Sequence, residues 1–388
     1  MAITTKTLHI ALIVETSMES GRQILGGISK YAMENGPWSI FHQPAHLDQS
    51  LPEWIDDWRG DGIIARIRSR DTAQAIINTG IPAIDVLGEI EDSGVPLVHV
   101  DDRAIATAAF THLQERSFRH YAFVGIKGPN WSRNRLHTFR SLVADSGSQF
   151  GQLSLELNPT ITPWEQEQEL LSKWLASLAK PCAVMTCNDY AGQRVLDACR
   201  RASILVPEEL AIVGVDNDEV ICTLSTPTLS SVNAGHFEVG YESARSLVEL
   251  IDGKPIAPQF FVQNYNCVSR ESTDATAVNN PTLAAALSFI RNNACQDIVS
   301  RDVARHVGVS LSSLKRLFAS EHKHPINRCI IRARIDRAKI LLRDTDLSVE
   351  QIAARIGYSH AHYFSLAFKR ETELSPTTYR KQQSRNTR

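Results

Sequence analysis

The chain has 388 residues, which is enough for two to three domains with well-filled cores. Hydrophobic residues make up 43% of it and charged residues 22%, which excludes a disordered or membrane-embedded protein and fits an ordinary globular one. The net charge of −2 is unevenly distributed: residues 281–388 hold 19 Lys and Arg against 9 Asp and Glu, a balance of +10, so the remainder carries −12. This asymmetry indicates a nucleic-acid-binding module joined to an acidic sensor or enzyme.

The first 270 residues alternate strand-like and helix-like segments. Continuous apolar runs such as Leu8–Val14 are typical of parallel strands that are buried on both faces. Strands are predicted at 8–14, 38–41, 62–65, 81–86, 97–100, 121–125, 182–186, 210–216 and 260–267. Helices are predicted at 21–34, 53–58, 72–79, 105–115, 134–144, 163–178, 190–202 and 237–251. Two successive sets of such units predict two similar α/β lobes, each built on a parallel sheet.

Residues 271–282 are polar and interrupt this alternation. We therefore predict a linker there, between a domain at 1–270 and an all-helical domain at 283–388.

The helical domain contains the same small pattern twice, at 300–320 and at 348–370. Ala304 is followed four residues later by Gly308, and Ala353 is followed at the same spacing by Gly357. In a helix-turn-helix the small residue lets two helices pack closely and the glycine takes the turn between them. We expect a serine to cap the second helix of each copy. Two copies 49 residues apart predict two helix-turn-helix units joined by a long helix.

The second helix of each unit is expected to enter the major groove of DNA and read bases with its outward face. In the first copy Leu314, Leu317 and Phe318 keep helical spacing and are expected in the core; Phe364, Ala367 and Phe368 play this part in the second copy. The expected DNA-binding residues are Ser312, Ser313, Lys315, Arg316, His360, Ala361, His362, Tyr363, Ser365 and Lys369. For any single basic residue, an ordinary solvated surface charge is the alternative interpretation.

The segments Gly308–Phe318, Gly357–Ser359, Tyr363–Ser365 and Ser375–Arg380 resemble the DNA-binding domain of the arabinose-regulator (AraC/XylS) family. The family often has arginine where this chain has Leu366. Because of this departure, we expect the second helix to read DNA less strongly, or through fewer phosphate contacts.

The runs Val100–Asp102, Cys187–Asp189, Val213–Asn217 and Pro227–Val232 resemble the effector domain of the lac/gal repressor family. This resemblance implies a two-lobed, periplasmic-binding-protein-like sensor over about residues 7–270, with a small ligand in the cleft. The chain would cross between the lobes three times, near 101–116, 228–232 and 253–260. That family usually carries its DNA-binding headpiece at the N-terminus, whereas here we expect DNA binding at the C-terminal end.

Ligands of open α/β folds bind at the carboxyl ends of the strands. This rule selects the sugar-binding candidates Glu15, Ser17, Asp102, Trp131, Arg135, Asn188, Asp189 and Asp216. By resemblance, Arg135 matches the family's ligand-binding arginine, and Asp189 and Asp216 match its polar contacts. Carboxylates can accept hydrogen bonds from sugar hydroxyls, arginine can donate them, and Trp131 could stack on an apolar sugar face. Each aspartate could instead cap a helix, and Trp131 could be a packed loop residue.

The combination of both domains resembles the bacterial xylose-operon regulators over essentially the whole chain. The resemblance implies a cytoplasmic, homodimeric transcription activator that binds double-stranded DNA, responds to D-xylose and helps to recruit RNA polymerase. A different sugar or a repressor remains open as an alternative.

An enzyme with an appended DNA-binding domain is the remote alternative. The sequence has no nucleophile elbow, no phosphate loop and no dinucleotide fingerprint, and Gly26-Gly27 falls within a predicted helix. Its seven cysteines show no CxxC pair, no apolar run has transmembrane length, and Met1 to Thr7 is polar. We therefore expect reduced thiols, no cofactor, no metal, no membrane association and no signal peptide.

Overall fold

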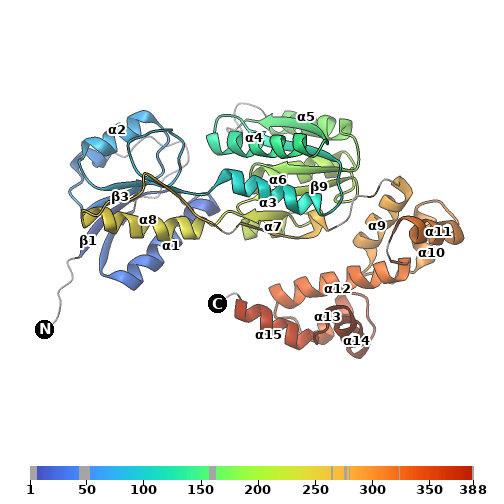
Figure 1. Ribbon diagram of the computed structural model, residues 1–388. Helices are drawn as coiled ribbons and strands as arrows, with labels where there is room; N and C mark the ends of the chain where they lie inside the picture. The colour runs from blue at the N-terminus through green and yellow to red at the C-terminus, as the bar shows by residue number, and fades with distance from the viewer. Residues whose placement is uncertain are drawn as a thin grey trace. The chain divides into compact units, whose positions relative to one another are not determined.

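The computed structural model describes residues 7–42, 53–156, 163–263, 265–274, 278, 280–322 and 324–386. The chain forms two compact units, Met1–Ala275 and Thr276–Arg388. The first unit consists of two α/β lobes and the second is entirely helical, as the ribbon drawing shows (Figure 1). The predicted fold class, a two-lobed parallel α/β sensor followed by a helical domain, is confirmed.

The first lobe is built on a parallel six-stranded sheet with the order β11-β5-β4-β3-β1-β2. Its strands are β1 (Leu8–Ile13), β2 (Trp38–His42), β3 (Gly62–Ala65), β4 (Ala83–Asp85), β5 (Leu97–His99) and β11 (Gln259–Phe261). Helix α8 (His236–Ile251) packs on β3, β4 and β5 and against α1 (Glu19–Asn35). On the other face, η1 (Glu53–Asp57) and α2 (Arg70–Asn78) contribute Ile55 and Ile76 to an apolar cluster with Ile63.

The second lobe repeats the plan with the strand order β12-β10-β9-β8-β6-β7. Its strands are β6 (His120–Ile126), β7 (Gln149–Leu155), β8 (Cys182–Thr186), β9 (Leu210–Val215), β10 (Ser230–Asn233) and β12 (Asn266–Val268). Helices α3 (Asp102–Gln114) and α4 (Asn130–Asp145) cover one face. Helices α5 (Trp164–Ser177) and α6 (Asp189–Arg201) cover the other, and the short α7 (Glu219–Leu224) follows β9. Only β12 among these described strands runs antiparallel to its neighbour.

The chain passes between the lobes at three places, and two of them lie later than predicted. The first crossing falls between β5 and α3, at the start of the predicted 101–116 segment. Residues 228–232 are mostly strand β10, and the chain changes lobe after it, before α8. Residues 253–260 still belong to the first lobe, because the predicted single strand 260–267 is two strands in different sheets. The third crossing therefore lies between β11 and β12.

The predicted linker begins too early, because η2 (Glu271–Thr273) belongs to the second lobe. Ser272 and Thr273 are fully buried. The Ser272 hydroxyl donates to the Ile212 carbonyl at 2.6 Å, and the Thr273 hydroxyl lies 2.7 Å from that of Ser230. The short polar side chains of this segment are typical of a linker, but Ser272 and Thr273 instead bind the end of the sensor to β9 and β10. Residues 275–277 and 279 of the predicted linker lie outside the described residues.

The helical unit has two apolar cores, one for each predicted helix-turn-helix. Its helices are α9 (Pro281–Asn293), α10 (Ser300–His306), α11 (Leu311–Glu321), α12 (Ile326–Asp344), α13 (Val349–Arg355), α14 (Ala361–Thr372) and α15 (Pro376–Asn386). Leu314 and Phe318 of α11 pack with α9, α10 and the first turns of α12. Phe364 and Phe368 of α14 pack with α13 and the last turns of α12. The long helix α12 thus links the two halves.

The turn of each helix-turn-helix passes through a glycine in a left-handed conformation, with φ of +69° at Gly308 and +83° at Gly357. These values explain the repeated glycine, because other residues adopt them only at a cost. Ser310 caps α11 through a hydrogen bond from the Ser313 N–H, at 3.1 Å. The expected serine cap of the second copy is wrong: α14 is preceded by His360, which makes no side-chain cap.

Among the described helices, none is both long enough and apolar enough to cross a membrane.

Candidate functional site

A buried charged cluster in the first unit is centred on Arg135, in the second turn of α4. Arg135 is 3% exposed, and its Nε donates to Asp102 Oδ1 at 2.8 Å. Its Nη1 donates to the Cys187 carbonyl at 2.6 Å and lies 3.9 Å from Asp216 Oδ1. Burial raises the pKa of Asp102, while the charge of Arg135 opposes this rise. The fold therefore brings together three predicted ligand residues, Arg135, Asp102 and Asp216.

Trp131 lies beside this cluster, one turn earlier on α4. The guanidinium carbon of Arg135 is 5.3 Å from the centre of the Trp131 ring, which is only partly buried. This geometry is a cation–π contact. The indole therefore supports the guanidinium as well as offering an aromatic surface.

Asn188 and Asp189 begin helix α6, and the fold gives them structural partners. The Asn188 side chain accepts a hydrogen bond from the Ala191 N–H at 2.9 Å, so it is the helix N-cap. Asp189 is 1% exposed and accepts from the Ser231 hydroxyl at 2.6 Å and from the Asp218 N–H at 2.8 Å. Burial raises the pKa of Asp189 well above its usual value. Both oxygens are thus held by protein donors that join α6 to neighbouring segments, and a contact of Asp189 with a ligand stays a prediction.

Glu15, at the end of β1, lies in the first lobe among arginines that the sequence analysis missed. It forms a buried ion pair with Arg66, and its Oε2 is 3.8 Å from Arg68. Arg66 also donates to the Ser20 hydroxyl at 3.1 Å. Both arginines follow β3, so the rule about strand ends could have found them. The predicted Ser17 is exposed, and its carbonyl accepts from Arg22 at 3.2 Å.

Two histidines and a tyrosine at the crossings were also missed. His236 Nε2 lies 3.1 Å from Asp216 Oδ1. His99 is buried, and desolvation together with nearby positive charge holds its pKa well below the usual value, so the ring is neutral. The Tyr265 hydroxyl donates to the Val262 carbonyl and accepts from the Asp101 N–H, each at 2.6 Å. Tyr265 thus ties the third crossing to the first.

The two lobes are in direct contact at two places. The Glu89 carboxylate, in the loop after β4, accepts from the Asn130 N–H at the start of α4, at 2.9 and 3.2 Å. Elsewhere, Arg22 of α1 lies 3.7 Å from Asp218, which precedes α7. The helix that carries Trp131 and Arg135 is therefore attached at its first residue to the opposite lobe.

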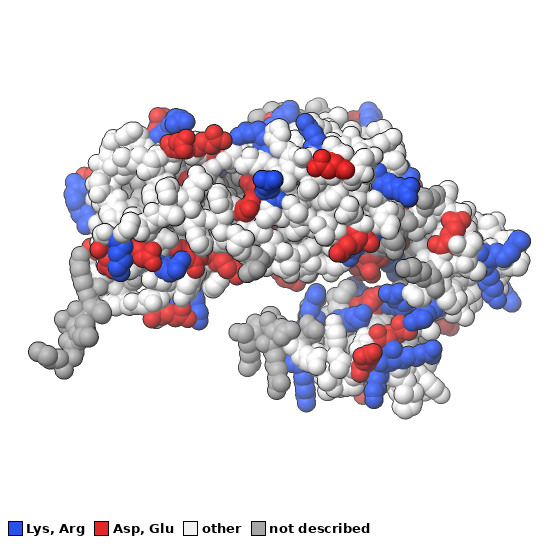
Figure 2. All heavy atoms as spheres, viewed as in Figure 1, with Lys and Arg blue, Asp and Glu red and all other residues white. Residues whose placement is uncertain are grey.

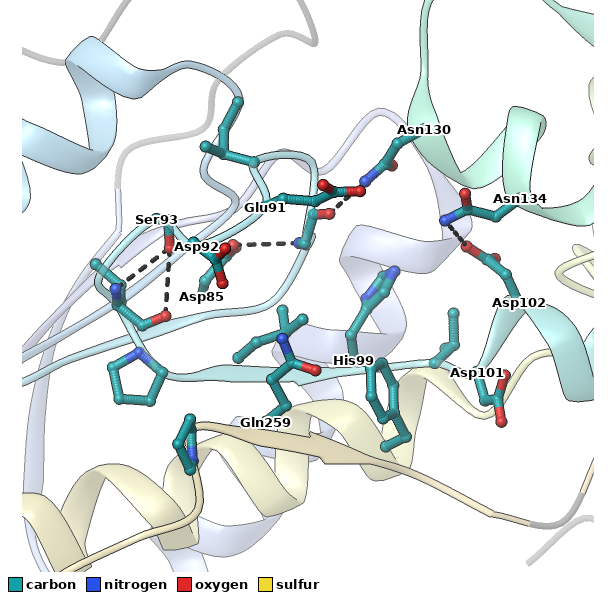
Figure 3. A pocket seen from close by; sticks show the side chains of 18 of the residues that line it. Asp85, Glu91, Asp92, Ser93, His99, Asp101, Asp102, Asn130, Asn134 and Gln259 are labelled. Carbon is teal, nitrogen blue, oxygen red and sulfur yellow. Dashed lines mark hydrogen bonds between the residues drawn. The ribbon is translucent and has the colours of Figure 1, made fainter.

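A cavity of about 850 Å³ opens beside the charged cluster (Figure 3). Asp102 is the one predicted ligand residue in its wall, and Asp85, His99, Asn130 and Asn134 also line it. The other predicted residues follow β1, β6, β8 and β9 in the chain, and Trp131 and Arg135 among them lie on α4. The candidate site thus has a compact ionic part and a roomier part.

Asp85 ends strand β4, and its side chain is expected to make stability depend on pH. The carboxylate accepts backbone N–H groups of Ile67 at 3.2 Å and Leu87 at 2.9 Å. Burial nevertheless raises the pKa of Asp85 to about 6. Because this folded value lies above the usual one, the folded state binds the proton more tightly than the unfolded chain does. Asp85 therefore adds stability as the pH falls from 7 to 4.

We expect the free energy of unfolding of the wild type to rise by about 2 kcal/mol relative to Asp85→Asn between pH 7 and pH 4. Urea unfolding of both proteins at the two pH values measures this difference. The control is Asp71→Asn, in an exposed first turn of α2, which should show no change of this size. A wild type that loses stability relative to Asp85→Asn at pH 4 would contradict the prediction.

In the helical unit, α11 and α14 are the second helices of the two helix-turn-helix units, which is the position of a recognition helix. On α11, Ser312, Lys315 and Arg316 are exposed, whereas Ser313 is partly buried beside the capping Ser310. On α14, His362, Lys369 and the 63%-exposed Tyr363 are at the surface, as is His360 just before it. Ser365 is partly buried. Ala361 packs against the core, so it offers less surface than predicted.

Leu366 is 55% exposed on the same face of α14, an apolar position in the middle of a polar surface. Figure 2 shows Lys and Arg side chains over much of the visible face of this unit, with fewer Asp and Glu. The geometry gives two exposed helices with basic surroundings, which is the arrangement a DNA-binding surface requires.

Arg334 of α12, which the sequence analysis did not single out, connects the two halves of this unit. It donates to the carbonyls of Ala294 at 2.6 Å, Gln296 at 3.0 Å and Gly357 at 3.2 Å, and lies 5.5 Å from the centre of the Tyr358 ring. The guanidinium of Arg334 thus joins the turn between α13 and α14 to the segment that follows α9. Within the described part of the chain, no group of three His, Cys, Asp or Glu side chains is placed to hold a metal ion.

Comparisons with known proteins agree with both units. A periplasmic binding protein-like domain model matches residues 110–273, and a helix-turn-helix domain model matches residues 303–382. A solved structure of the xylose-binding transcription activator xylR superposes with a TM-score of 0.86 at 29% identity, covering 97% of this chain and 98% of that one.

Two curated relatives match along nearly their whole length. The xylose operon regulatory protein of Escherichia coli (strain K12) is 31% identical over 388 residues, covering 97% of each chain. The protein of the same name from Haemophilus influenzae (strain Rd) is 31% identical over 387 residues, covering 97% of this chain and 99% of its own. Coverage of this extent spans the sensor and the helix-turn-helix unit together. The chain belongs to the family of the xylose operon regulatory proteins, which are sugar-responsive transcription regulators.

Proposed function

We propose that this protein is a cytoplasmic activator of xylose-utilisation genes that binds D-xylose between its two lobes. The observation that carries the proposal is the buried cluster of Arg135, Asp102 and Asp216 in a chain that also has two helix-turn-helix units. The names of the relatives reported above support xylose as the effector. They also support a regulator in preference to an enzyme.

The chemistry of the cluster suits a small polyol. Carboxylates such as Asp216 accept hydrogen bonds from sugar hydroxyls, and Arg135 can donate to ring or hydroxyl oxygens. Trp131 offers an apolar face to the C–H side of a sugar ring. Glu15 and its arginines would contribute from the first lobe. A sugar that touches both lobes favours their closed arrangement, and its differential affinity for open and closed states supplies the energy of the switch.

In this proposal closure changes how the helix-turn-helix units of two subunits in a homodimer engage DNA. Helices α11 and α14 of one subunit would enter successive major grooves, about 34 Å apart along the duplex. Bound in this way beside a promoter, the dimer would help to recruit RNA polymerase.

The proposal is tested by calorimetry with D-xylose and by gel-shift titration of operator DNA with and without the sugar. We expect saturable binding of xylose, at least about tenfold weaker binding by Asp216→Asn, and higher DNA affinity with the sugar. Binding of a different sugar from a panel, but not of xylose, would change the effector. Equal DNA affinity with and without every sugar that binds would refute the switch.

Replacement of both Lys315 and Arg316 by alanine is expected to weaken operator binding by about 10- to 100-fold, because each exposed side chain can contact a base or a phosphate. The dependence of the logarithm of affinity on the logarithm of salt concentration should become shallower by about 2 if both residues neutralise phosphates. Fluorescence anisotropy at several salt concentrations measures both effects.

The matched control is Lys173→Ala, an exposed charge on α5 of the sensor, which should leave DNA affinity unchanged. Sugar binding by the double variant should also equal that of the wild type. Unchanged operator affinity in a double variant that melts like the wild type would exclude α11 as the recognition helix.

A further inference from the structure

The cavity beside the ionic cluster is larger than a single pentose needs. Its volume of about 850 Å³ lies toward the upper end of the range for small-molecule sites, roughly 300 to 1,000 Å³. Its walls come from the loop after β4, from the ends of β5 and β11, and from α4 of the other lobe. Figure 3 shows Asn130 and Asn134 of α4 on one side, and His99 and Gln259 of the neighbouring strands on the other.

The lining has the composition that recognises a carbohydrate. Polar side chains that can pair with hydroxyls, among them Glu91, Asn134 and Gln259, line it together with the apolar residues Ile256, Pro258 and Phe261. Phe261 is 40% exposed, so its ring is available to a ligand. A sugar ring presents hydroxyls at its edge and C–H groups on its face, and mixed lining of this kind satisfies both.

Two buried polar atoms of residues that line the cavity make no hydrogen bond to the described residues. Oδ1 of Asn130 and Nδ1 of His99 are buried and have no hydrogen-bond partner among the described residues. Buried polar atoms without partners are uncommon because they cost free energy. Groups of this kind in a cavity wall point to a polar ligand.

The cavity adjoins the proposed sugar site at Asp102. This residue lines the cavity, accepts from Arg135 at 2.8 Å, and lies 3.5 Å from the Asn134 amide nitrogen, which lines the cavity too. A ligand bound at Arg135 could therefore extend past Asp102 into the cavity without leaving the protein.

We infer that the cavity is a subsite for a second sugar unit, so that this regulator binds a β-xyloside such as xylobiose with one xylose at Arg135 and the other against Phe261 and Gln259. The inference rests on the proposed function, because it places the first sugar unit in the site described there. It names the effector class as short xylo-oligosaccharides in addition to the free pentose.

The experiment is calorimetry of the full chain with D-xylose, methyl β-D-xyloside and xylobiose. We expect xylobiose to bind about tenfold more tightly than methyl β-D-xyloside, which corresponds to one or two net hydrogen bonds in the second unit. Gln259→Trp fills the cavity from an exposed strand position and should remove this tenfold advantage. It should leave the affinity for D-xylose within about twofold.

Gln149→Trp is the matched control, since it places the same side chain on β7, the exposed edge strand of the other sheet. It should not change binding of any of the three sugars. The subsite would be refuted if xylobiose bound no better than methyl β-D-xyloside, or if Gln259→Trp left its affinity unchanged. In either case, binding of D-xylose would still support the proposed function. Failure of all three sugars to bind would overturn both.

Discussion

Replacement of Arg135 by alanine is expected to abolish sugar binding and to destabilise the sensor. The change removes the donor to Asp102 and to the Cys187 carbonyl, and it leaves the Asp102 carboxylate buried without its positive partner. An uncompensated buried charge of this kind costs about 3 to 5 kcal/mol. Loss of the donor that we place against the ligand should weaken xylose binding by more than about 100-fold.

A second variant separates binding from folding. Arg135→Lys keeps the positive charge near Asp102 but loses the planar fork that reaches two acceptors at once. We expect it to fold, to melt at a somewhat lower temperature than the wild type, and to bind xylose about 10- to 100-fold more weakly. Calorimetry and thermal unfolding of the same preparations give both quantities.

The control is Arg140→Ala, on the same helix but at the surface, where the arginine contacts Gln152 and the Phe150 ring. Its affinity for xylose should equal that of the wild type. A folded Arg135→Lys protein that binds xylose with wild-type affinity would show that the guanidinium does not contact the sugar.

Alanine at Gly27 is expected to destabilise the first lobe by about 3 kcal/mol or more, while alanine at the adjacent Gly26 is expected to stabilise it slightly. A Cβ at Gly27 would lie 2.0 Å from the Phe237 carbonyl oxygen and 2.6 Å from the Tyr241 nitrogen. Both are backbone atoms of α8, so α1 and α8 would have to move apart, at the cost of an overpacked core. Urea unfolding, followed by a signal from the sensor, measures the change.

The outcome for Gly26 differs because its added Cβ would meet only the Phe237 ring, at 3.5 Å, which is an ordinary contact. Alanine is favoured over glycine within a helix by about 0.5 to 1 kcal/mol. Two neighbouring glycines in one helix should thus give effects of opposite sign. Similar stabilisation by both substitutions would mean that helix α1 does not pack on α8 through Gly27.

Much of this molecule could be predicted from local sequence patterns. The buried strands of both lobes follow from continuous apolar runs, which only a strand covered on both faces tolerates. The helix-turn-helix units follow from a repeated Ala-to-Gly spacing, and both glycines take the left-handed conformation that the turn requires. Ser348 and Gln351, three residues apart, form a capping box at the start of α13, which is another pattern that local sequence determines. These features depend on residues that are close together in the chain.

The candidate site could be predicted only in part. Position after a strand was enough to select Asp102, Arg135 and Asp216, and the fold brings them within reach of one another. The same rule also selected Asp189, whose partners Ser231 and Asp218 come from other segments. Applied to β3 and β5, the rule would also have selected Arg66 and His99. It gave no reason to choose His236, which begins α8, because its importance depends on which strands and crossings become neighbours.

The sequence by itself determined the kinds of element, their order and the presence of two units, since hydrophobic period and turn residues act over a few positions. Only the tertiary structure decided that the segment 260–267 contributes strands to two different sheets. It also decided that Ser272 and Thr273 are buried at the end of the sensor and do not begin a linker. Finally, it decided that Gly27, but not Gly26, packs against the backbone of another helix. Each of these depends on contacts between residues far apart in the chain. Such contacts are selected by the packing of whole layers, and no local pattern encodes them.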